Sequence, residues 1–547
     1  MGDGSDPLGL AEQTELFVAL VAAVGTDVGM IGEEVAIELA EYAYKVHPLR
    51  LSEYLAEEAG EDFSEKMFDE QLWDAMTAGN QLRTSWDRSD ALALHAISDI
   101  VATREELSPP VAQDAQPDSL DRHAFVLRSL KTPDELETLR AIYGPRLVVI
   151  AAYSPSDQRL DHLATQIATS RGTTDRSTWV HQPEDLIDRD EKEERARGQD
   201  VSGTFHRGDF FIRGWNRAVA REDIQRSMEI LFGSPFRTPT RDEYGQFLAA
   251  GAAMRSAEFG RQVGAAIATR EGSIIAVGTN EVPKAFGGSH WEEDGQGNRD
   301  FEIGTIDTNR SHIDELAGQF AERVDERLAG LVESLSAGDP TAQAKLQALQ
   351  VALREALPGD LWAAGLKDLT EFGRAVHAEM NALLDAALRG VPVAGATLHS
   401  STFPCHNCAR HLIGAGISRV VFIEPYTKSR AEQLHADSAT IAHSEGDLSK
   451  VAFEPFVGVA PRRYLEMFDA AGRERLGHLA RKDGSGHKLE FIKKQATPVF
   501  ADAGLPQFAP EPREYRIKEL LALDHFAEHA GAPEDSVRKN GEATGSS

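Results

Sequence analysis

The sequence predicts an α/β protein built from two domains. Its 547 residues are too many for one hydrophobic core. In the first part of the chain, short apolar runs typical of buried strands alternate with segments of helical periodicity, which favours a mostly parallel sheet covered on both faces. From about Thr238 the pattern of the sheet region reads strand, strand, helix, strand, helix, strand. We therefore expect an N-terminal parallel-sheet domain, followed by a three-layer α/β/α domain that a long helical insertion interrupts.

Changes in composition place the domain boundaries. Residues 1–14 and the end of the chain are rich in Gly, Ser, Asp and Glu, a composition typical of disordered ends. We assign residues 15–235 to the N-terminal domain and residues 236–480 to the second domain, with the insertion at about 286–369. The remainder, 481–547, is expected to be a C-terminal extension with a disordered end.

Three apolar runs define the expected N-terminal sheet. The first, Leu16–Ala22, leads into a glycine-containing loop and a helix expected from about Glu33 to Tyr44. The second and third are Arg146–Tyr153 and Asp209–Ile212. Between these two, the strongly charged stretch Glu184–Gly203 predicts a surface helix or a lid.

The second domain begins with helical periodicity from Asp242 to Ser256. The next two runs, Val263–Ala268 and Ser273–Gly278, predict paired strands joined by a tight turn. The insertion starts as a polar loop, and its later part, from about His312 to Ala356, predicts one or two helices. The remaining elements are expected at Val376–Leu388 (helix), Ala396–Ser400 (strand), Asn407–Ala415 (helix) and Arg419–Ile423 (strand).

Composition limits the kind of partner. The chain has 57 basic and 88 acidic side chains, a net charge of -31. Proteins that hold a nucleic-acid polymer through its phosphates usually present a basic face, so this balance favours a small phosphorylated substrate and disfavours extended DNA binding. The apolar run Leu16–Val24 is far shorter than the about 20 residues that cross a bilayer, and nothing near the N-terminus resembles a signal peptide. We expect a cytoplasmic protein that does not enter a membrane.

The chain has two cysteines, Cys405 and Cys408, which excludes a disulfide framework. A C-x-x-C pair is either a redox pair or a set of metal ligands. Here Pro404 precedes the first cysteine, and a His-x-Glu motif formed by His377 and Glu379 lies upstream. H-x-E with P-C-x-x-C is the known signature of zinc-dependent nucleobase deaminases, so the flanking residues favour metal binding.

The three residues suit a catalytic zinc site, which takes three protein ligands and leaves one position for water. Cys405 and Cys408 lie about one helical turn apart, so both sulfurs can face one Zn²⁺ ion. The N-terminus of their helix also favours the thiolate form of a cysteine ligand. His377 is expected to open a second helix and to supply the third ligand.

Glu379 follows His377 by two residues, so it is expected to act beside the metal as general acid and base and not as a ligand. Zinc lowers the pKa of a bound water molecule to about 7. Glu379 would take the proton of this water, pass it to N3 of a cytosine ring and help ammonia leave C4.

Two other interpretations of these residues stay open. The cysteines could form a thioredoxin-like redox pair, although Pro404 and the upstream His-x-Glu motif argue against it. A closed structural zinc site would need a fourth ligand; His406 is available, but it directly follows Cys405 and would face away on the helix. His399 and His411 are expected to be packing or surface residues.

Around these motifs the chain resembles the cytidine/deoxycytidylate deaminase superfamily. Arg261–Ala265 resembles the first strand of deoxycytidylate deaminases, Gly278–Pro283 their second strand and following loop, and Ala415–Phe422 the step from helix to strand after the cysteines. The resemblance covers about residues 254–425 without the insertion. It implies a cytidine deaminase-like fold and a zinc-dependent enzyme that deaminates deoxycytidine nucleotides.

Carried over by position, the resemblance assigns Asn280 to the sugar and the backbone around Ala378 to the base. Basic residues that flank the motifs are the candidates for the phosphates, although each could equally be a solvated surface charge. These candidates are Arg255, Arg261, Lys284, Arg374 and Lys428.

Glu424–His435 and the first domain narrow the resemblance to bacterial anti-phage dCTP deaminases. This resemblance implies conversion of dCTP, and often dCMP, to the uracil nucleotide, which depletes dCTP during phage infection. It also implies that the enzyme is held inactive until infection, in some members by a small RNA. Deoxycytidylate deaminases commonly form hexamers, so a homo-oligomer is expected.

The first domain resembles P-loop nucleotide kinases in its architecture. Ala22–Gly29 lies between a strand and a helix, where a phosphate loop belongs. It departs from the G-x-x-x-x-G-K-[ST] pattern, because Asp27 stands at the second glycine and Val28 at the lysine. Phosphoryl transfer is therefore not expected, and a regulatory nucleotide site and a structural relic both stay open. The nucleotide-binding candidates are Gly25, Thr26, Asp27 and Gly29.

The sequence thus predicts a zinc-dependent deaminase of free deoxycytidine nucleotides with a role in defence. A housekeeping dCMP deaminase with a regulatory domain shares this chemistry and is the main alternative. A polynucleotide-editing deaminase or RNA-binding regulator is disfavoured by the acidic balance and by the lack of interleaved aromatic and basic residues. A nucleotide sensor with a structural zinc would leave Glu379 without a role.

Overall fold

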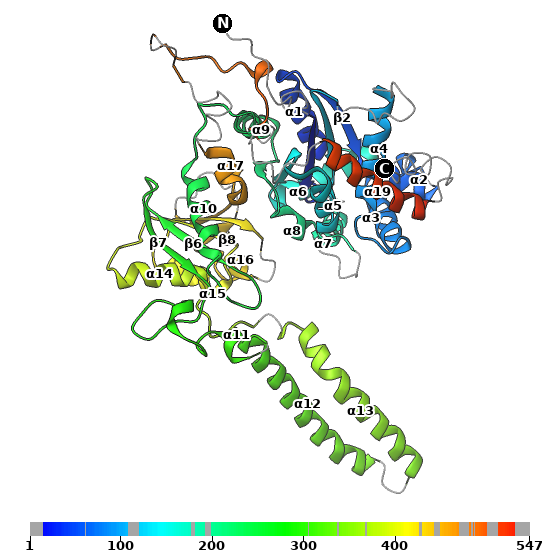
Figure 1. Ribbon diagram of the computed structural model, residues 1–547. Coiled ribbons are helices and arrows are strands. Elements are labelled where there is room, and N and C mark those ends of the chain that lie inside the picture. The colour runs from blue at the N-terminus through cyan, green and yellow to red at the C-terminus, as the bar shows by residue number, and fades with distance from the viewer. Residues whose placement is uncertain are drawn as a thin grey trace, which may run out of the picture. The chain divides into compact units, whose positions relative to one another are not determined.

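The chain divides into two compact units, residues 1–244 with 455–547 and residues 245–454 (Figure 1). The expected disordered ends lie outside the described residues. The computed structural model describes residues 15–60, 62–107, 120–176, 181–191, 198–304, 306–335, 339–366, 369–425, 429–441, 449–469, 481–482, 485, 487–499 and 512–530.

The first unit is built on a six-stranded sheet around β1 (Leu16–Ala22). β1 pairs in parallel with β3 (His123–Arg128) on one side and with β4 (Leu147–Tyr153) on the other. β2 (Lys45–Arg50) and β5 (Phe210–Arg213) extend the parallel sheet, and the full order is β12-β5-β4-β1-β3-β2. Every residue of β1 is buried, as its unbroken apolar sequence predicts for a central strand covered on both faces.

Helices cover both faces of this sheet. Successive residues of β1 point to opposite faces, so Leu16 packs with α1 (Val28–Glu41) and α9 (Arg217–Leu231), whereas Phe17 packs on the other side with α4, α5 and α19. α1 begins earlier than the sequence predicts because Asp27 caps its N-terminus. The other helices of the unit are α2 (Leu51–Ala59), α3 (Phe68–Ser85), α4 (Ala91–Leu107), α5 (Pro133–Tyr143), α6 (Ser156–Ser170), α7 (His181–Glu191), α8 (Val201–Phe205), α17 (Tyr464–Phe468) and α19 (Pro512–Ala530).

The sequence analysis places residues 455–469 in the second domain, but in the structure they belong to the first unit. β12 (Gly458–Val459) pairs antiparallel with β5 at the edge of the first sheet. Next to it, Arg462 and Arg463 form ion pairs with the buried carboxylate of Asp209. A strand of two residues leaves no periodic signal, so the sequence alone does not reveal this return.

The second unit has its own six-stranded sheet, in the order β10-β11-β9-β8-β6-β7. As the sequence predicts, β6 and β7 pair antiparallel. β6 also pairs antiparallel with β8, and β8 pairs in parallel with β9. The short strands β10 and β11 pair in parallel. The bounds are β6 (Gly264–Ala268), β7 (Ile274–Thr279), β8 (Thr397–Thr402), β9 (Arg419–Glu424), β10 (Ala439–Ile441) and β11 (Val451–Pro455).

Two glycines let helices approach this sheet closely. A Cβ atom on Gly264 would lie 1.9 Å from the carbonyl oxygen of Ala249 in α10 (Arg241–Ala253). A Cβ atom on Gly278 would lie 2.1 Å from the carbonyl oxygen of Ala378. Any larger residue would therefore push these helices away from the strands. The other helices that pack around this sheet are α14 (Ala378–Leu388), α15 (His406–Gly414) and α16 (Ala431–Leu434).

The insertion consists of a loop, the short helix α11 (Asp300–Ile303) and two long helices, α12 (Thr308–Leu335) and α13 (Pro340–Ala363). α12 and α13 pack against each other as a hairpin that extends away from the sheet of their own unit (Figure 1). Among the described helices, none combines the length and the apolar character that crossing a bilayer requires.

Candidate active site

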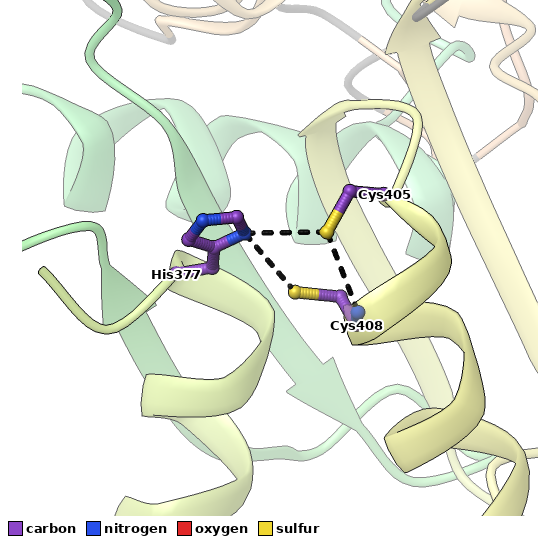
Figure 2. A group of neighbouring side chains, drawn as sticks. All are labelled: His377, Cys405 and Cys408. Carbon is purple, nitrogen blue, oxygen red and sulfur yellow. Dashed lines mark hydrogen bonds between the residues drawn. The ribbon is translucent and has the colours of Figure 1, made fainter. Parts of the chain in front are cut away.

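Two helix N-termini of the second unit bring three metal-binding side chains together. His377 is the N-cap residue of α14, and Cys405 is the N-cap residue of α15. Cys408 lies in the first turn of α15, where its backbone N–H donates to the Cys405 sulfur at 3.4 Å. Figure 2 shows the imidazole of His377 pointing at both sulfurs. Both cysteines are buried and free, so neither is part of a disulfide.

The distances in this cluster fit a zinc ion. Nδ1 of His377 lies 3.4 Å from the sulfur of Cys405 and 3.4 Å from that of Cys408. A tetrahedral zinc ion, with bonds of about 2.0 Å to nitrogen and 2.3 Å to sulfur, would hold these atoms about 3.5 Å apart. All three potential ligand atoms lie within 4.8 Å of one another. His406, the alternative fourth ligand, is not part of this group.

The cluster perturbs the titration of its own members. The hydrogen bond with Cys405 raises the pKa of His377 to about 9. Hydrogen bonds from Cys408 and His377 lower the pKa of the Cys405 thiol to about 4, whereas the pKa of Cys408 is raised well above its usual range by the contact with Cys405 and by burial. One thiolate is thus already stabilised, and a cation placed here would displace the remaining protons.

Glu379 lies beside the cluster in the first turn of α14. Its side chain is buried, and its Oε2 atom lies 3.6 Å from the sulfur of Cys408. Burial raises the pKa of this carboxyl group above its ordinary value. The site therefore contains a carboxyl group that can carry a proton next to three potential ligands.

Asn280, assigned to the sugar by sequence, holds in place the backbone segment that precedes β6. Its Oδ1 accepts a hydrogen bond from the backbone N–H of Val263 at 2.7 Å, and its Nδ2 donates to the carbonyl oxygen of Arg261 at 2.7 Å. Ala378, assigned to the base, is fully buried where α14 meets Gly278. Ala378 directly follows the ligand candidate His377 at the start of α14, and Asn280 directly follows β7.

Each phosphate candidate among the described residues already contacts a partner within the protein. Arg261 pairs with Glu424 at 2.6 Å, and Arg374 pairs with Asp300 at 2.9 Å. Lys284 pairs with Asp294. Lys428 lies outside the described residues.

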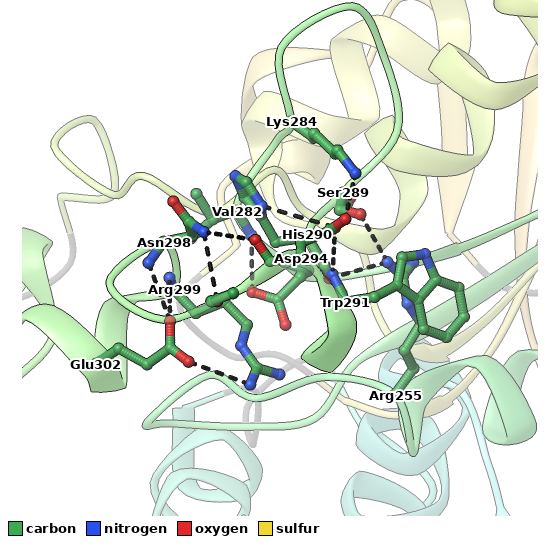
Figure 3. A network of polar contacts seen from close by, with 12 residues as sticks. Arg255, Val282, Lys284, Ser289, His290, Trp291, Asp294, Asn298, Arg299 and Glu302 are labelled. Carbon is green, nitrogen blue, oxygen red and sulfur yellow. Dashed lines mark hydrogen bonds and ion pairs between the residues drawn. The ribbon is translucent and has the colours of Figure 1, made fainter.

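Arg255, the remaining candidate, belongs to a polar network that folds the first part of the insertion (Figure 3). Its guanidinium group lies over the ring of Trp291 and donates to the carbonyl oxygens of Ser289 and His290. In the same loop, the Asp294 carboxylate accepts from the backbone N–H of Trp291 at 2.9 Å. The sequence predicts this loop as polar but gives no indication that it is ordered by its own side chains.

Sequence reasoning missed two polar residues near the site. Asn381 of α14 donates from Nδ2 to the carbonyl oxygen of Thr279 and to the hydroxyl of Ser289. Glu258 is half-buried, and burial together with the nearby Asp300 raises its pKa to about 7. Asn381 follows His377 by one helical turn, a spacing that could have identified it; Glu258 has no comparable signal.

In the first unit, Gly25 and Asp27 line a cavity of about 510 Å³ at the carboxyl ends of β1, β4 and β5. Gly25 has φ +87°, and a Cβ atom there would lie 2.8 Å from Arg159, so glycine is required. The Asp27 carboxylate accepts from the backbone N–H of Met30 at 2.8 Å. The N-terminus of α1 is therefore already satisfied by a side chain of the protein itself.

The other two nucleotide-binding candidates do not line this cavity. Thr26 is buried and lines a second cavity of about 230 Å³, and Gly29 lies in the first turn of α1. The cavity of about 510 Å³ also has Ser154, His162 and Trp215 among its walls.

Comparison with known proteins relates the second unit to a family. Residues 239–424 match the family model described as the cytidine and deoxycytidylate deaminase zinc-binding region. ComE operon protein 2 of Bacillus subtilis (strain 168) is 32% identical over 127 residues, which are 23% of this chain and 63% of that protein. The deoxycytidylate deaminase of Enterobacteria phage T2 is 40% identical over 55 residues, 10% of this chain and 29% of that enzyme.

The human deoxycytidylate deaminase is 30% identical over 89 residues, 16% of this chain and 45% of that enzyme. The chain thus spans less than two thirds of the length of each of these relatives. Among solved structures, the dCMP deaminase from the cyanophage S-TIM5 in apo form is 15% identical, covering 40% of this chain and 99% of that one. The TM-score of this match is 0.20.

Proposed function

We propose that the second unit, which contains a cytidine/deoxycytidylate deaminase domain with zinc as its cofactor, hydrolyses deoxycytidine nucleotides to deoxyuridine nucleotides and ammonia. One observation supports this most directly. His377, Cys405 and Cys408 converge, and the buried carboxyl group of Glu379 lies 3.6 Å from the Cys408 sulfur. A structural zinc site has no use for such an acid, whereas a deaminase needs one as its proton carrier.

In the proposed mechanism, His377 would hold zinc through Nδ1, and Cys405 and Cys408 through their sulfurs. Bound zinc lowers the pKa of a water molecule to about 7 and so supplies a nucleophile at neutral pH. Glu379 would accept a proton from this water and pass it to N3 of the cytosine ring, which makes C4 more electrophilic. It would then deliver the second proton of the water to the amino group, which leaves as ammonia, while the oxygen stays on C4.

The environment of Glu379 suits this role. Burial raises the pKa of its carboxyl group, so it can hold a proton between the two transfers. We further propose that Asn280 contacts the sugar and that the backbone at Ala378 contacts the base. For the phosphates we propose Arg261, Lys284 and Arg374, each of which would have to exchange its present carboxylate partner for the substrate.

We propose dCTP and dCMP as substrates, and depletion of dCTP during phage infection as the role, from the resemblance to anti-phage dCTP deaminases. In this proposal the first unit is a P-loop-kinase-like regulatory domain, and Gly25, Thr26, Asp27 and Gly29 are its nucleotide-binding residues. The cavity of about 510 Å³, which Gly25 and Asp27 line but Thr26 and Gly29 do not, supports such a role because it lies at the carboxyl ends of parallel strands, where α/β sheets bind ligands. An inhibitory small RNA and a hexameric assembly belong to the same proposal.

A housekeeping dCMP deaminase is the second candidate function, because the relatives of the second unit include the deoxycytidylate deaminases of Enterobacteria phage T2 and of human. The two functions differ in the nucleotide that is consumed. A strong preference for dCTP over dCMP would favour the defence role, and the reverse preference would favour the housekeeping role.

The proposed activity is tested by incubating the purified full-length chain with dCTP, dCMP, CTP and CMP and separating the products by chromatography. We expect uracil nucleotides from the deoxyribonucleotides. The Glu379→Gln variant should retain zinc and form no product above background. If the zinc-loaded wild-type protein formed no uracil product from any of the four nucleotides, the proposal would be wrong.

A further inference from the structure

One face of the α12–α13 hairpin is apolar and uncovered in the described part of the second unit. On α12, the side chains of Leu316, Phe320, Leu331 and Leu335 are exposed, from 42% for Leu316 to 72% for Leu335. None of the described residues of α13 is buried, although its sequence is rich in leucine and alanine. Soluble monomers rarely leave so many large apolar side chains along one element, and such faces usually mark interaction sites.

The four exposed residues of α12 form one stripe. Leu316 and Phe320 are about one helical turn apart, and so are Leu331 and Leu335. Phe320 and Leu331 are separated by about three turns, so the two pairs lie on the same side of the helix. This side differs from the seam of the hairpin, where Asp325 accepts a hydrogen bond from Gln350 of α13 at 2.7 Å.

The stripe is symmetric along the helix. The midpoint between Leu316 and Leu335 falls between Asp325 and Glu326, and the midpoint between Phe320 and Leu331 falls at the same place. A two-fold axis through this point therefore superposes the stripe on itself in the antiparallel direction. Leu316 then meets Leu335 of a second copy, and Phe320 meets Leu331, as an isologous interface requires. Binding to an unrelated protein or to a lipid surface would not require the apolar residues to be spaced symmetrically.

Four charged side chains lie near the midpoint of the stripe. Glu322, Arg323, Glu326 and Arg327 have no ion-pair partner among the described residues. By helical spacing Arg323 and Arg327 border the stripe, whereas Glu322 and Glu326 lie on the other side of α12, so the guanidinium groups are the charges nearest to a second copy. The long arginine side chains can lie along the apolar stripe while their charged ends reach a carboxylate of the other copy.

We propose that α12 pairs antiparallel with α12 of a second copy of this chain, across a two-fold axis near residues 325 and 326, so that two hairpins form a four-helix bundle. This inference goes beyond the proposed deaminase activity and does not depend on it. With a rise of 1.5 Å per residue, the 28-residue helix is about 42 Å long, enough for a continuous helical interface.

Engineered cysteines test the antiparallel geometry directly. Within one chain, Leu316 and Leu335 are about 28 Å apart along the helix, so cysteines at these positions cannot form an intramolecular disulfide. In the proposed dimer they face each other. The Leu316→Cys/Leu335→Cys variant, oxidised with glutathione disulfide, should give at least ten times more covalent dimer on a non-reducing gel than either single variant.

Two results of this experiment would overturn the proposal. Equal dimer from the single variants would indicate parallel or random contacts, and no dimer from the double variant would exclude the antiparallel pairing. The native Cys405 and Cys408 are buried, and the wild-type chain, treated in the same way, controls for their reaction.

A second measurement uses the molar mass of the full-length chain by light scattering. The Phe320→Glu/Leu331→Glu variant should have half the mass of the wild type, with unchanged zinc content and helical circular dichroism. The matched control, Ala329→Glu/Ala344→Glu, adds the same charge at exposed positions off the stripe and should keep the wild-type mass. A wild-type mass of 59.7 kDa at all concentrations, or an unchanged mass in the stripe variant, would contradict the proposal.

Discussion

Two histidines, a buried one in the first unit and a partly buried one in the second, show how the surroundings decide what the same side chain can do. His95 of α4 stacks against the rings of Trp86 and Tyr54, and burial lowers its pKa to about 4. His377 opens α14 beside two sulfurs, and its hydrogen bond with Cys405 raises its pKa to about 9. His95 is kept neutral by the aromatic side chains around it, whereas His377 contacts two sulfurs that could bind the same metal ion.

The comparison shows that burial alone does not make a functional site. Both environments shield the imidazole from water at least in part, but only the second places further ligands and an acid, Glu379, within reach. His95 therefore contributes to packing and to the pH dependence of stability, whereas His377 belongs to a centre that can do chemistry. Substitutions in the two units should therefore differ in their consequences, from a large loss of turnover in the second unit to a small loss of stability in the first.

The largest effect is expected from substitution of Glu379, because this acid lies beside His377 and has no counterpart beside His95. Glu379→Gln preserves the shape of the side chain but removes its ability to transfer protons. General acid and base groups typically contribute about 10² to 10⁴-fold to the rate. Turnover of the preferred deoxycytidine nucleotide should therefore fall by at least about 100-fold. Steady-state kinetics with zinc content as the control measures it. Wild-type turnover in this variant would remove Glu379 from the mechanism.

Removal of one ligand should empty the metal centre. His377→Asn is expected to lower the bound zinc from about one ion per chain by at least tenfold, because a catalytic site has only three protein ligands to lose. His411→Asn, on the exposed side of α15, is the matched control and should retain zinc. Elemental analysis after gel filtration measures both proteins. Equal zinc in the two variants would contradict the assignment of His377.

His95 should make the first unit sensitive to acid. The unfolded chain binds a proton at the ordinary histidine pKa of 6.5, whereas the folded chain does so only near 4. The stabilisation is therefore complete above pH 6.5 and is lost as the pH falls toward 4. We expect a loss of about 3 kcal/mol in the free energy of unfolding over this range. In chemical denaturation, His95→Phe should lose correspondingly less; an identical pH profile would refute this role.

The smallest effect is expected at the N-terminus of α1. Asp27→Ala removes the side-chain acceptor for the Met30 N–H and should lower the stability of the first unit by about 1 kcal/mol. Asp27→Asn keeps an acceptor and should be close to neutral. Thermal unfolding of both variants checks this difference. Neither variant should change zinc content, and loss of zinc from either would contradict the separation of the two units.

Much of the site could be predicted from sequence because its residues are close together in the chain. The spacing of Cys405 and Cys408 and the position of Pro404 predict one helix start, and His377 predicts another. The central strands β1 and β4 could also be predicted from the sequence, since buried parallel strands have unbroken apolar sequences.

Other features depend on contacts between residues far apart in sequence and could not be predicted. β2 contains a proline and exposed charges, so it lacks the signal of a strand, and it is defined by its pairing with β3. The partners of Arg261 and Arg374 are remote carboxylates, Glu424 and Asp300, which no local pattern connects to them. Periodicity describes one element at a time, whereas these pairs form only when the chain has folded.

The most direct test of the account is a zinc titration of the metal-free protein with deaminase activity followed in the same samples. Wild-type chain stripped with a chelator should be inactive on deoxycytidine nucleotides, and activity should return in proportion to zinc, reaching its limit at about one ion per chain. The two cysteines should become protected from thiol reagents over the same range. Full activity without zinc, or a recovered enzyme in which Cys405 and Cys408 form a disulfide, would contradict the central claim.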